Sequence, residues 1–303
     1  MRILLATDGS SSADQARDLV AALPWREGGL VRIASVAPTG IEHDEGLQKQ
    51  RDALDAAELE IRCGGGDLQI ETVLIRGRAA SEIVDQAGEF DADVVVVGHR
   101  GLGAWDELLL GSVAAEVVDQ APCPVLVARD ERLGPVILAE DGSTTARTAE
   151  CLVARWPLFS GLPVTVVTVG EDEPAARARA RLSRGLGTNR YDDPLDVARR
   201  RRDDEAVLAA ERLRDAGFEA TAEHREGDPA HQIIACAADH EAGLIVIGSR
   251  GQSSLGRLRL GSVARKVLIH APCSVLVVRE GATLEGRRLE RRREERELVS
   301  AFG

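Results

Sequence analysis

The sequence contains the same glycine pattern twice, each time between a short apolar run and a segment with helical periodicity. The pattern is G-x2-G-x9-G-S; one copy begins at Gly248, and the other begins 150 residues earlier, at Gly98. Apolar runs at residues 94–97 and 244–247 come directly before the two copies. A strand that leads through a glycine loop into a helix offers backbone N–H groups and a helix N-terminus to phosphate oxygens. The duplication therefore predicts two related α/β units, each with a candidate phosphate site.

Apolar and polar residues around the first copy predict an alternation of strands and helices. Strands are expected at residues 3–6, 30–36, 68–75, 94–97 and 125–128, and helices at residues 12–23, 45–63, 79–87 and 112–120. Uninterrupted valine runs are typical of strands that are buried on both faces. This order predicts an open, mostly parallel five-stranded sheet with helices on both faces. The order restarts at Val136, so the fold class is α/β with two such sheets in tandem.

The repeat also predicts the domain boundaries. The first domain is expected at residues 1–132 and the second at residues 133–283, followed by a charged tail at residues 284–303. The second unit carries 17 extra residues in the Arg-rich region 171–204, between its second and third strands. We interpret its charged run, Arg199 to Arg202 followed by three acidic residues, either as a solvated helix face or mobile loop, or as a segment that docks a partner. The tail is a surface helix or a disordered end, and the sequence does not indicate its role.

Composition narrows the classes of partner. The chain has 303 residues and a formal net charge of −12, which disfavours a nucleic-acid partner. The five cysteines include no C-x2-C pair, so we expect reduced thiols; Cys123 and Cys273 occupy equivalent positions, where a small buried apolar residue is favoured over a redox role. No apolar run approaches the roughly 20 residues that span a bilayer, and the N-terminal run is too short for a signal peptide. We therefore expect a cytoplasmic protein without a membrane partner.

Three motifs in combination give the chain a family resemblance. They are the glycine pattern, the A-T-D-G-S segment at residues 6–10, and the A-P-C-P-V-L-V segment that follows the first loop. The combination is similar to that of the nucleotide-binding universal stress proteins, over roughly residues 1–130 and 134–280. The resemblance implies a Rossmann-like fold of the adenine nucleotide alpha hydrolase type. It also implies ATP, ADP or AMP as cofactor, with or without Mg²⁺, and dimerisation through the last strand of the sheet.

The resemblance assigns roles to residues at matching positions. The loop glycines and the serine after them hold the phosphates, and the arginine at the third loop position lies near them. The aspartate after the first strand lies by the ribose or adenine, and the residue near the end of the second strand contacts adenine through its backbone. The candidate binding residues are Thr7, Asp8, Val36, Gly98, Arg100, Gly101, Gly111, Ser112 and Val113 in the first unit, and Asp141, Val169, Gly248, Arg250, Gly251, Gly261, Ser262 and Val263 in the second.

Each of these residues also has a purely structural interpretation. Asp8 and Asp141 are good candidates for helix N-caps. In this interpretation, Gly111 and Gly261 are needed only because a helix packs closely on the sheet. Arg100 and Arg250 are then surface ion-pair partners. Their convergence at the carboxyl ends of parallel strands favours ligand binding.

The interiors of the two loops differ in charge. The first carries Asp106 and Glu107, whereas the second carries Arg257 and Arg259. If these side chains face the ligand, the second site should bind a phosphorylated ligand more tightly, since guanidinium groups form charge-assisted hydrogen bonds with phosphate.

No catalytic motif is present in the sequence. It contains no H-E-x-x-H, no G-x4-G-K-(S/T) and no G-x-S-x-G segment. The favoured hypothesis is a nucleotide-binding stress regulator that is not an enzyme. The alternatives are a slow ATP-hydrolysing enzyme, in which Asp8 or Asp141 places Mg²⁺ or water, and a scaffold without nucleotide.

The two halves are expected to associate within one chain. Residues 125–128 and 275–278 form apolar final strands, and an exposed apolar edge strand favours pairing. Only six residues, 129–134, link the halves, which keeps the two edges at high effective concentration. We predict that these strands pair antiparallel in an intramolecular pseudo-dimer. A homodimer through another surface remains an open alternative.

Overall fold

Strands and helices alternate regularly through both halves of the chain. The computed structural model describes residues 1–25, 29–39, 44–64, 68–101, 110–170, 194–251 and 260–279. The first half contains β1 (Arg2–Ala6), α1 (Ser11–Ala21), β2 (Gly29–Ala37), α2 (Asp44–Cys63), β3 (Leu68–Arg76), α3 (Ala79–Glu89), β4 (Val94–Gly98), α4 (Ser112–Gln120) and β5 (Val125–Ala128). The second half contains β6 (Val136–Ala139), α5 (Thr144–Arg155), the 3-10 turn η1 (Pro157–Phe159), β7 (Val164–Gly170), α7 (Pro194–Asp215), β8 (Ala220–Glu226), α8 (Pro229–Asp239), β9 (Leu244–Gly248), α9 (Ser262–His270) and β10 (Ser274–Val278).

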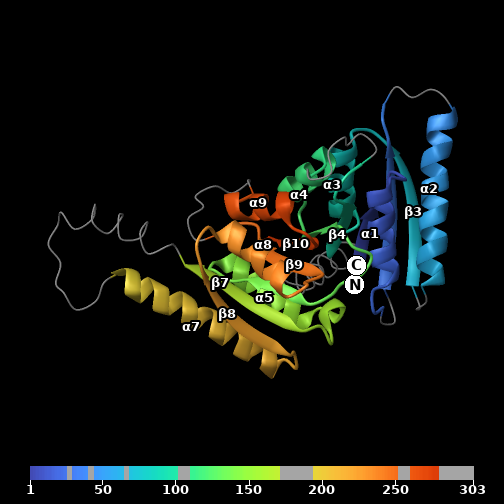
Figure 1. Cartoon of the computed structure of the whole chain (residues 1–303). Coiled ribbons are helices and arrows are strands. Elements are labelled where there is room, and N and C mark those ends of the chain that lie inside the picture. Colours follow the sequence, from blue (N-terminus) through green and yellow to red (C-terminus); the bar gives the residue numbers. More distant parts are fainter. Residues whose placement is uncertain are drawn as a thin grey trace, which may run out of the picture.

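The ten strands form one continuous sheet, in the order β3-β2-β1-β4-β5-β10-β9-β6-β7-β8. Each half supplies five parallel strands, as the sequence predicts, and β3 and β8 lie at the two far ends of the sheet (Figure 1). The α/β fold with a mostly parallel, open sheet is therefore confirmed. The structure adds that the two five-stranded units share a single sheet.

The junction between the halves is the antiparallel pair β5–β10. Val127 lies opposite Val275, Leu126 opposite Leu276, and Val125 opposite Val277. These three β5 residues and their β10 partners are at most 3% exposed. This confirms the predicted intramolecular pairing of the final strands, which buries two apolar edges that each half would otherwise expose.

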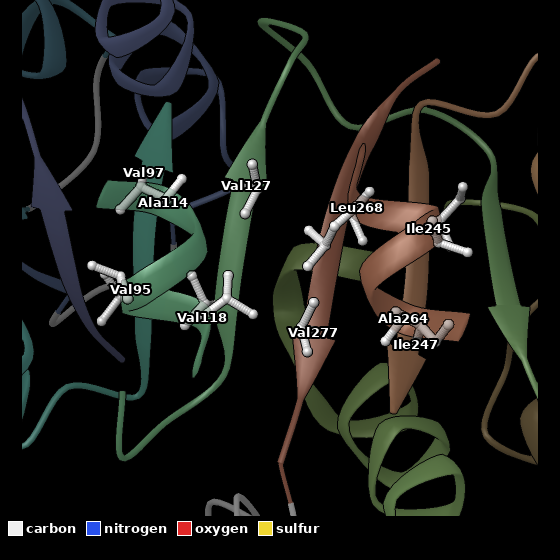
Figure 2. Packing of buried hydrophobic residues seen from close by; sticks show 14 of the residues in the cluster. Val95, Val97, Ala114, Val118, Val127, Ile245, Ile247, Ala264, Leu268 and Val277 are labelled. Carbon is white, nitrogen blue, oxygen red and sulfur yellow. The ribbon is translucent and has the colours of Figure 1, made fainter. Parts of the chain in front are cut away.

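Helices cover both faces of the sheet and divide the core into two layers. On one face, α1, α2, α5 and α7 bury residues such as Leu19, Ile61 and Leu213. On the other face, α3, α4, α8 and α9 cover the sheet, and Figure 2 shows α4 and α9 packed beside the β5–β10 junction, with Val118 and Leu268 against the strand valines. Successive residues of one strand point to opposite faces, so Ile3 packs in the first core layer and Leu4 in the second. The predicted apolar runs are thus strands buried on both faces.

Several sequence predictions lie outside the described residues. The loop interiors with Asp106, Glu107, Arg257 and Arg259 and the tail 284–303 are among them, as is the part of the insertion at residues 171–193. Residues 194–204 of the insertion lie in α7. Among the helices of the described ranges, none combines the length and the apolar character that a membrane span needs.

Candidate functional site

The strand order creates a crevice in each half. In the first half, β1 pairs with β2 on one side and with β4 on the other, so the connections after β1 and β4 diverge. In the second half, β6 has the same position between β7 and β9. Such a switch point, at the carboxyl ends of parallel strands, is where open α/β sheets bind ligands. Asp8 and Asp141 follow β1 and β6, and the glycine loops follow β4 and β9.

The turn after the first strand has the same hydrogen bonds in both halves. Asp8 Oδ1 accepts a hydrogen bond from the Ser10 N–H at 3.0 Å, and Asp141 Oδ1 accepts one from the Ser143 N–H at 3.0 Å. The N-caps of α1 and α5 are Ser10 and Ser143, whose hydroxyls accept from the backbone N–H three residues later. The alternative that the aspartates cap these helices is therefore wrong, since the serines perform that role.

Each aspartate lies directly against its glycine loop. A Cβ atom added to Gly101 would lie 2.8 Å from Asp8 Oδ2, and one added to Gly251 would lie 2.6 Å from Asp141 Oδ2. Both distances are too short for a real side chain, so any residue larger than glycine at this position would push the carboxylate aside.

The first glycine of each motif has a packing role. A Cβ atom on Gly98 would lie 2.5 Å from the carbonyl carbon of Ser12 in α1, and one on Gly248 would lie 2.5 Å from Thr145 Oγ1 in α5. The helix after the first strand therefore lies tightly against the end of β4 or β9. This contact sets the position of the loop that follows.

The third glycine of each motif joins the end of the loop to its start through a backbone hydrogen bond. The Gly111 N–H donates to the His99 carbonyl at 2.8 Å, and the Gly261 N–H donates to the Ser249 carbonyl at 2.8 Å. A Cβ atom on Gly111 would lie 3.2 Å from Arg100 Cα, so the close contact is with the loop rather than the sheet. The two glycines are also the N-caps of α4 and α9, and neither can supply a side-chain cap. Among the described residues, no side chain caps the first N–H groups of these helices, and such groups bind anions at helix N-termini.

In the second half, these features surround a cavity of about 350 Å³. All eight candidate residues of that half line it, namely Asp141, Val169, Gly248, Arg250, Gly251, Gly261, Ser262 and Val263. Pro229 and Ile233 of α8 add an apolar wall. Pockets for small ligands typically have about 300–1,000 Å³, so the space suits a small molecule.

In the first half, the structure places the nine candidate residues at the equivalent positions of the repeat. Thr7 and Asp8 follow β1, Val36 is the penultimate residue of β2, and Gly98 ends β4. The remaining five are Arg100 and Gly101 in the loop, Gly111 at the N-cap of α4, and Ser112 and Val113 in its first turn. The Thr7 N–H donates to the Ala34 carbonyl, which fixes the turn beside β2.

Arginines give the loop region positive charge. Arg129, directly after β5, lies close enough to Arg100 for the two charges to repel, and Arg279, directly after β10, has the same relation to Arg250. Burial, reinforced by these neighbours, lowers the pKa of both Arg129 and Arg279. Burial and the charges of Arg129 and Arg100 also lower the pKa of His99 to about 4, so its imidazole is neutral at pH 7. Each loop thus has two arginines near it, and guanidinium groups form charge-assisted hydrogen bonds with phosphate.

Glu140 and Ser249 are among the cavity residues that were not candidates. Glu140 lines the cavity and is 4% exposed; its Oε1 accepts from the Gly142 N–H at 2.6 Å. Burial, with contributions from Asp141 and two other glutamates, raises the pKa of Glu140 to about 7. Ser249 also lines the cavity, and its buried hydroxyl has no hydrogen-bond partner among the described residues. Glu140 occupies the same position in the second half as the candidate Thr7 in the first. This alignment of the two repeats would have identified Glu140 from the sequence.

Comparisons with known proteins agree with this architecture. A model of the universal stress protein family matches residues 1–129 and, a second time, residues 134–279. A universal stress protein of Mycobacterium tuberculosis is 27% identical over 285 residues, which cover 81% of this chain and 81% of that protein. A universal stress protein of Synechocystis is 26% identical over 310 aligned positions, covering 91% of this chain and 99% of that protein.

A solved structure shows the same fold. The crystal structure of a universal stress protein from Archaeoglobus fulgidus superposes with a TM-score of 0.67 at 22% identity, and the match covers 92% of this chain and 98% of that chain. Since the family model accounts for most of the sequence in two successive copies, the chain belongs to the universal stress protein family.

Proposed function

We propose that each half binds an adenine nucleotide (ATP, ADP or AMP) and that the protein is a stress-response regulator rather than a catalyst. The observation that carries the proposal is that all eight candidate residues of the second half line one cavity. The proposed site in the first half rests on the same residue pattern at equivalent positions.

The chemistry of the cavity suits the parts of a nucleotide. Backbone N–H groups at the start of α9 and the guanidinium of Arg250 would hold phosphate oxygens. Asp141 lies against the loop and would accept a hydrogen bond from the ribose or adenine, and Val169 would contact adenine through its backbone. The apolar wall from α8 would cover the base. If Mg²⁺ accompanies the phosphates, Asp8 and Asp141, which lie against the loops, would supply carboxylate oxygens.

Calorimetric titration with ATP, ADP and AMP tests the binding. We expect micromolar dissociation constants, which correspond to about −8 kcal/mol. Gly251→Ala should abolish binding in the second half, because its methyl group would displace Asp141, and Gly101→Ala should do the same in the first half. Gly88→Ala is the matched control, since nothing lies within 4 Å of its added Cβ atom.

Retained nucleotide must first be removed and identified by mass spectrometry of the denatured sample. The proposal fails if nucleotide-free protein shows neither heat nor a thermal shift with millimolar nucleotide. It also fails if Gly101→Ala, Gly251→Ala and the double variant all bind as the parent does.

Phosphate release separates the regulator from the alternative of a slow ATPase. We expect turnover far below the enzyme median of about 10 s⁻¹. Release at several per second that is lost in Asp141→Ala or Asp8→Ala would establish the ATPase instead, with the aspartate placing Mg²⁺ or water.

A further inference from the structure

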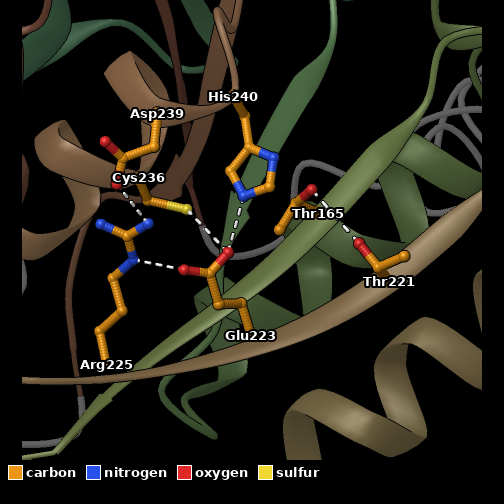
Figure 3. A network of polar contacts seen from close by, with 7 residues as sticks. All are labelled: Thr165, Thr221, Glu223, Arg225, Cys236, Asp239 and His240. Carbon is orange, nitrogen blue, oxygen red and sulfur yellow. Dashed lines mark hydrogen bonds and ion pairs between the residues drawn. The ribbon is translucent and has the colours of Figure 1, made fainter.

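A carboxylate, a thiol and an imidazole converge near the outer edge of the second half, away from the glycine loop. Glu223 belongs to β8, the last strand of the sheet, whereas Cys236 and His240 come from α8 and its C-cap. The two α8 residues are four positions apart, so they share one side of the helix. One ligand atom from each of the three residues lies within 4.8 Å of those of the other two, and Figure 3 shows the three side chains pointing toward one another.

Glu223 Oε2 is the centre of this group. It lies 2.7 Å from His240 Nε2, and the Cys236 thiol points to it at 3.8 Å. The other carboxylate oxygen, Oε1, accepts from Arg225 Nε at 2.6 Å, and Arg225 also binds Asp239 at 2.7 Å. Arg225 therefore fixes the carboxylate so that Oε2 faces the thiol and the imidazole.

The fold itself does not require these three residue types. In the first half, the repeat places Val73, Gln86 and Phe90 at the positions of Glu223, Cys236 and His240. Phe90 is fully buried there, with the Arg2 and Arg32 guanidinium groups over its ring. The same strand–helix packing thus forms with apolar and amide side chains. The cluster is a specific feature of the second half.

We propose that Glu223, Cys236 and His240 bind a divalent transition-metal ion with the ligand preference of Zn²⁺. Zinc takes thiolate sulfur, imidazole nitrogen and carboxylate oxygen, and three protein ligands leave a fourth position for water. The carboxylate is held by a hydrogen bond from outside the cluster, as ligating carboxylates are in metal sites. His240 is exposed on one side of the cluster, and the ion enters there.

The observed spacing is close to what such an ion needs. With Zn–S and Zn–O bonds of about 2.3 and 2.1 Å, a tetrahedral ion separates sulfur and oxygen by roughly 3.6 Å, near the observed 3.8 Å. The nitrogen–oxygen pair must open from 2.7 Å to roughly 3.3 Å, which requires only a small rotation of the exposed imidazole. On binding, the ion replaces the thiol proton and any proton shared by His240 and Glu223, and these protons pass to the solvent.

The test uses the full chain with Cys63 and Cys151 replaced by serine, because both thiols are exposed and would bind metal on their own. This background protein is titrated with ZnCl₂ against a chelator of known affinity. We expect one ion per chain. Glu223→Gln and His240→Gln should each weaken binding more than about tenfold, since loss of an outer-shell partner alone costs about that much. His231→Gln, an exposed histidine on the same helix, is the matched control and should bind as the background does.

Cobalt(II) gives a spectroscopic test of the thiol. Bound Co²⁺ should show the near-ultraviolet charge-transfer band of a cobalt–thiolate bond, and Cys236→Ser should lose it. Circular dichroism confirms that each variant is folded; His240→Gln, at an exposed position, keeps the test decisive if Cys236→Ser does not fold. Absence of zinc binding in the background protein overturns the proposal. Binding that His240→Gln and Glu223→Gln leave unchanged, or that His231→Gln weakens equally, does the same.

Discussion

At the level of single residues, Glu140 is the most unusual feature of the candidate site. The first half has Thr7 at this position, whereas the second half buries a carboxyl group in the cavity wall. Burial disfavours its charged form, and the neighbouring Asp141, Glu150 and Glu205 act in the same direction. The hydrogen bond from the Gly142 N–H opposes this effect only in part, so the pKa of Glu140 remains at about 7.

Glu140 should make the stability of the protein depend on pH. Its pKa is 4.5 in the unfolded chain and about 7 in the folded protein, so between these values the folded protein binds more protons. The free energy of unfolding therefore falls as the pH rises from about 4.5 to about 7, by on the order of 3 kcal/mol. Glu140→Gln, which keeps an oxygen for the Gly142 N–H, should be more stable than the parent at pH 8 and equal to it below pH 4.5.

Urea unfolding at several pH values measures this effect. Glu131→Gln, at an exposed carboxyl group, is the control and should leave the pH profile unchanged. If Glu140→Gln has the same profile as the parent, the carboxyl group does not titrate as its burial implies.

The cysteines should differ sharply in reactivity. Cys63 and Cys151 are exposed, whereas Cys123, Cys236 and Cys273 are buried. Burial and the nearby Asp130 raise the pKa of Cys273 to about 12, so its thiolate, the reactive form, is scarce at neutral pH. Iodoacetamide should therefore label the two exposed thiols of the native protein and all five only after denaturation. Peptide mass spectrometry identifies the sites, and native labelling of Cys273 would contradict the burial shown here.

At the level of elements, the contact between α1 and β4 controls the position of the first glycine loop. Gly98→Ala would place a methyl group against the backbone of Ser12, which cannot move without shifting the helix. Overpacking of this kind costs about 1–3 kcal/mol. By contrast, Gly88→Ala in α3 meets no atom within 4 Å and should stabilise the protein by up to about 1 kcal/mol. Urea unfolding of both variants compares them, and equal stability of Gly98→Ala and the parent would show that α1 is not held at this distance.

Sequence periodicity was sufficient to predict most of the elements. The predicted strand at 30–36 is β2 (Gly29–Ala37), and the predicted helix at 112–120 is α4 (Ser112–Gln120). These segments were predictable because burial on both faces of a sheet, or on one face of a helix, leaves a direct pattern in the residues. The convergence of Asp141 with the second loop was predictable for a similar reason, since parallel strands bring their carboxyl ends to one edge.

The remaining features depend on three-dimensional geometry and could not be predicted from local sequence patterns. That Ser10 rather than Asp8 caps α1 depends on the backbone angles of a single turn. The cluster of Glu223, Cys236 and His240 depends on how α8 is rotated against β8, and the three residues have no regular spacing in the sequence. The shift in the pKa of Glu140 follows from its burial. The sequence does not show whether the side chain of a residue that follows a strand is buried or exposed.

At the level of the whole molecule, reciprocal arginine contacts join the halves beside the β5–β10 pair. Arg129 Nη2, from the first half, donates to the Leu268 carbonyl of α9 at 2.6 Å. Arg279, from the second half, donates through Nη1 to the Ala121 carbonyl at 3.1 Å and through Nη2 to the Asp119 carbonyl of α4. Each half thus places a positive charge on the C-terminal carbonyls of a helix in the other half, where the helix dipole favours a cation.

These contacts should make the two halves depend on each other for stability. Arg129→Gln and Arg279→Gln each remove charge-assisted hydrogen bonds to partly buried carbonyls, so each should lower the free energy of unfolding by about 1.5–3 kcal/mol. The two contacts lie at opposite ends of the short β5–β10 ladder. The double variant keeps the ladder, its apolar contacts and the exposed Arg265–Asp119 ion pair between the halves. We expect calorimetry to show a single unfolding transition for the parent and a broadened or divided one for the double variant. Arg132→Gln, at an exposed arginine of the connecting segment, removes the same charge without these contacts and is the control. If the double variant unfolds like Arg132→Gln, these arginine contacts do not couple the stability of the two halves.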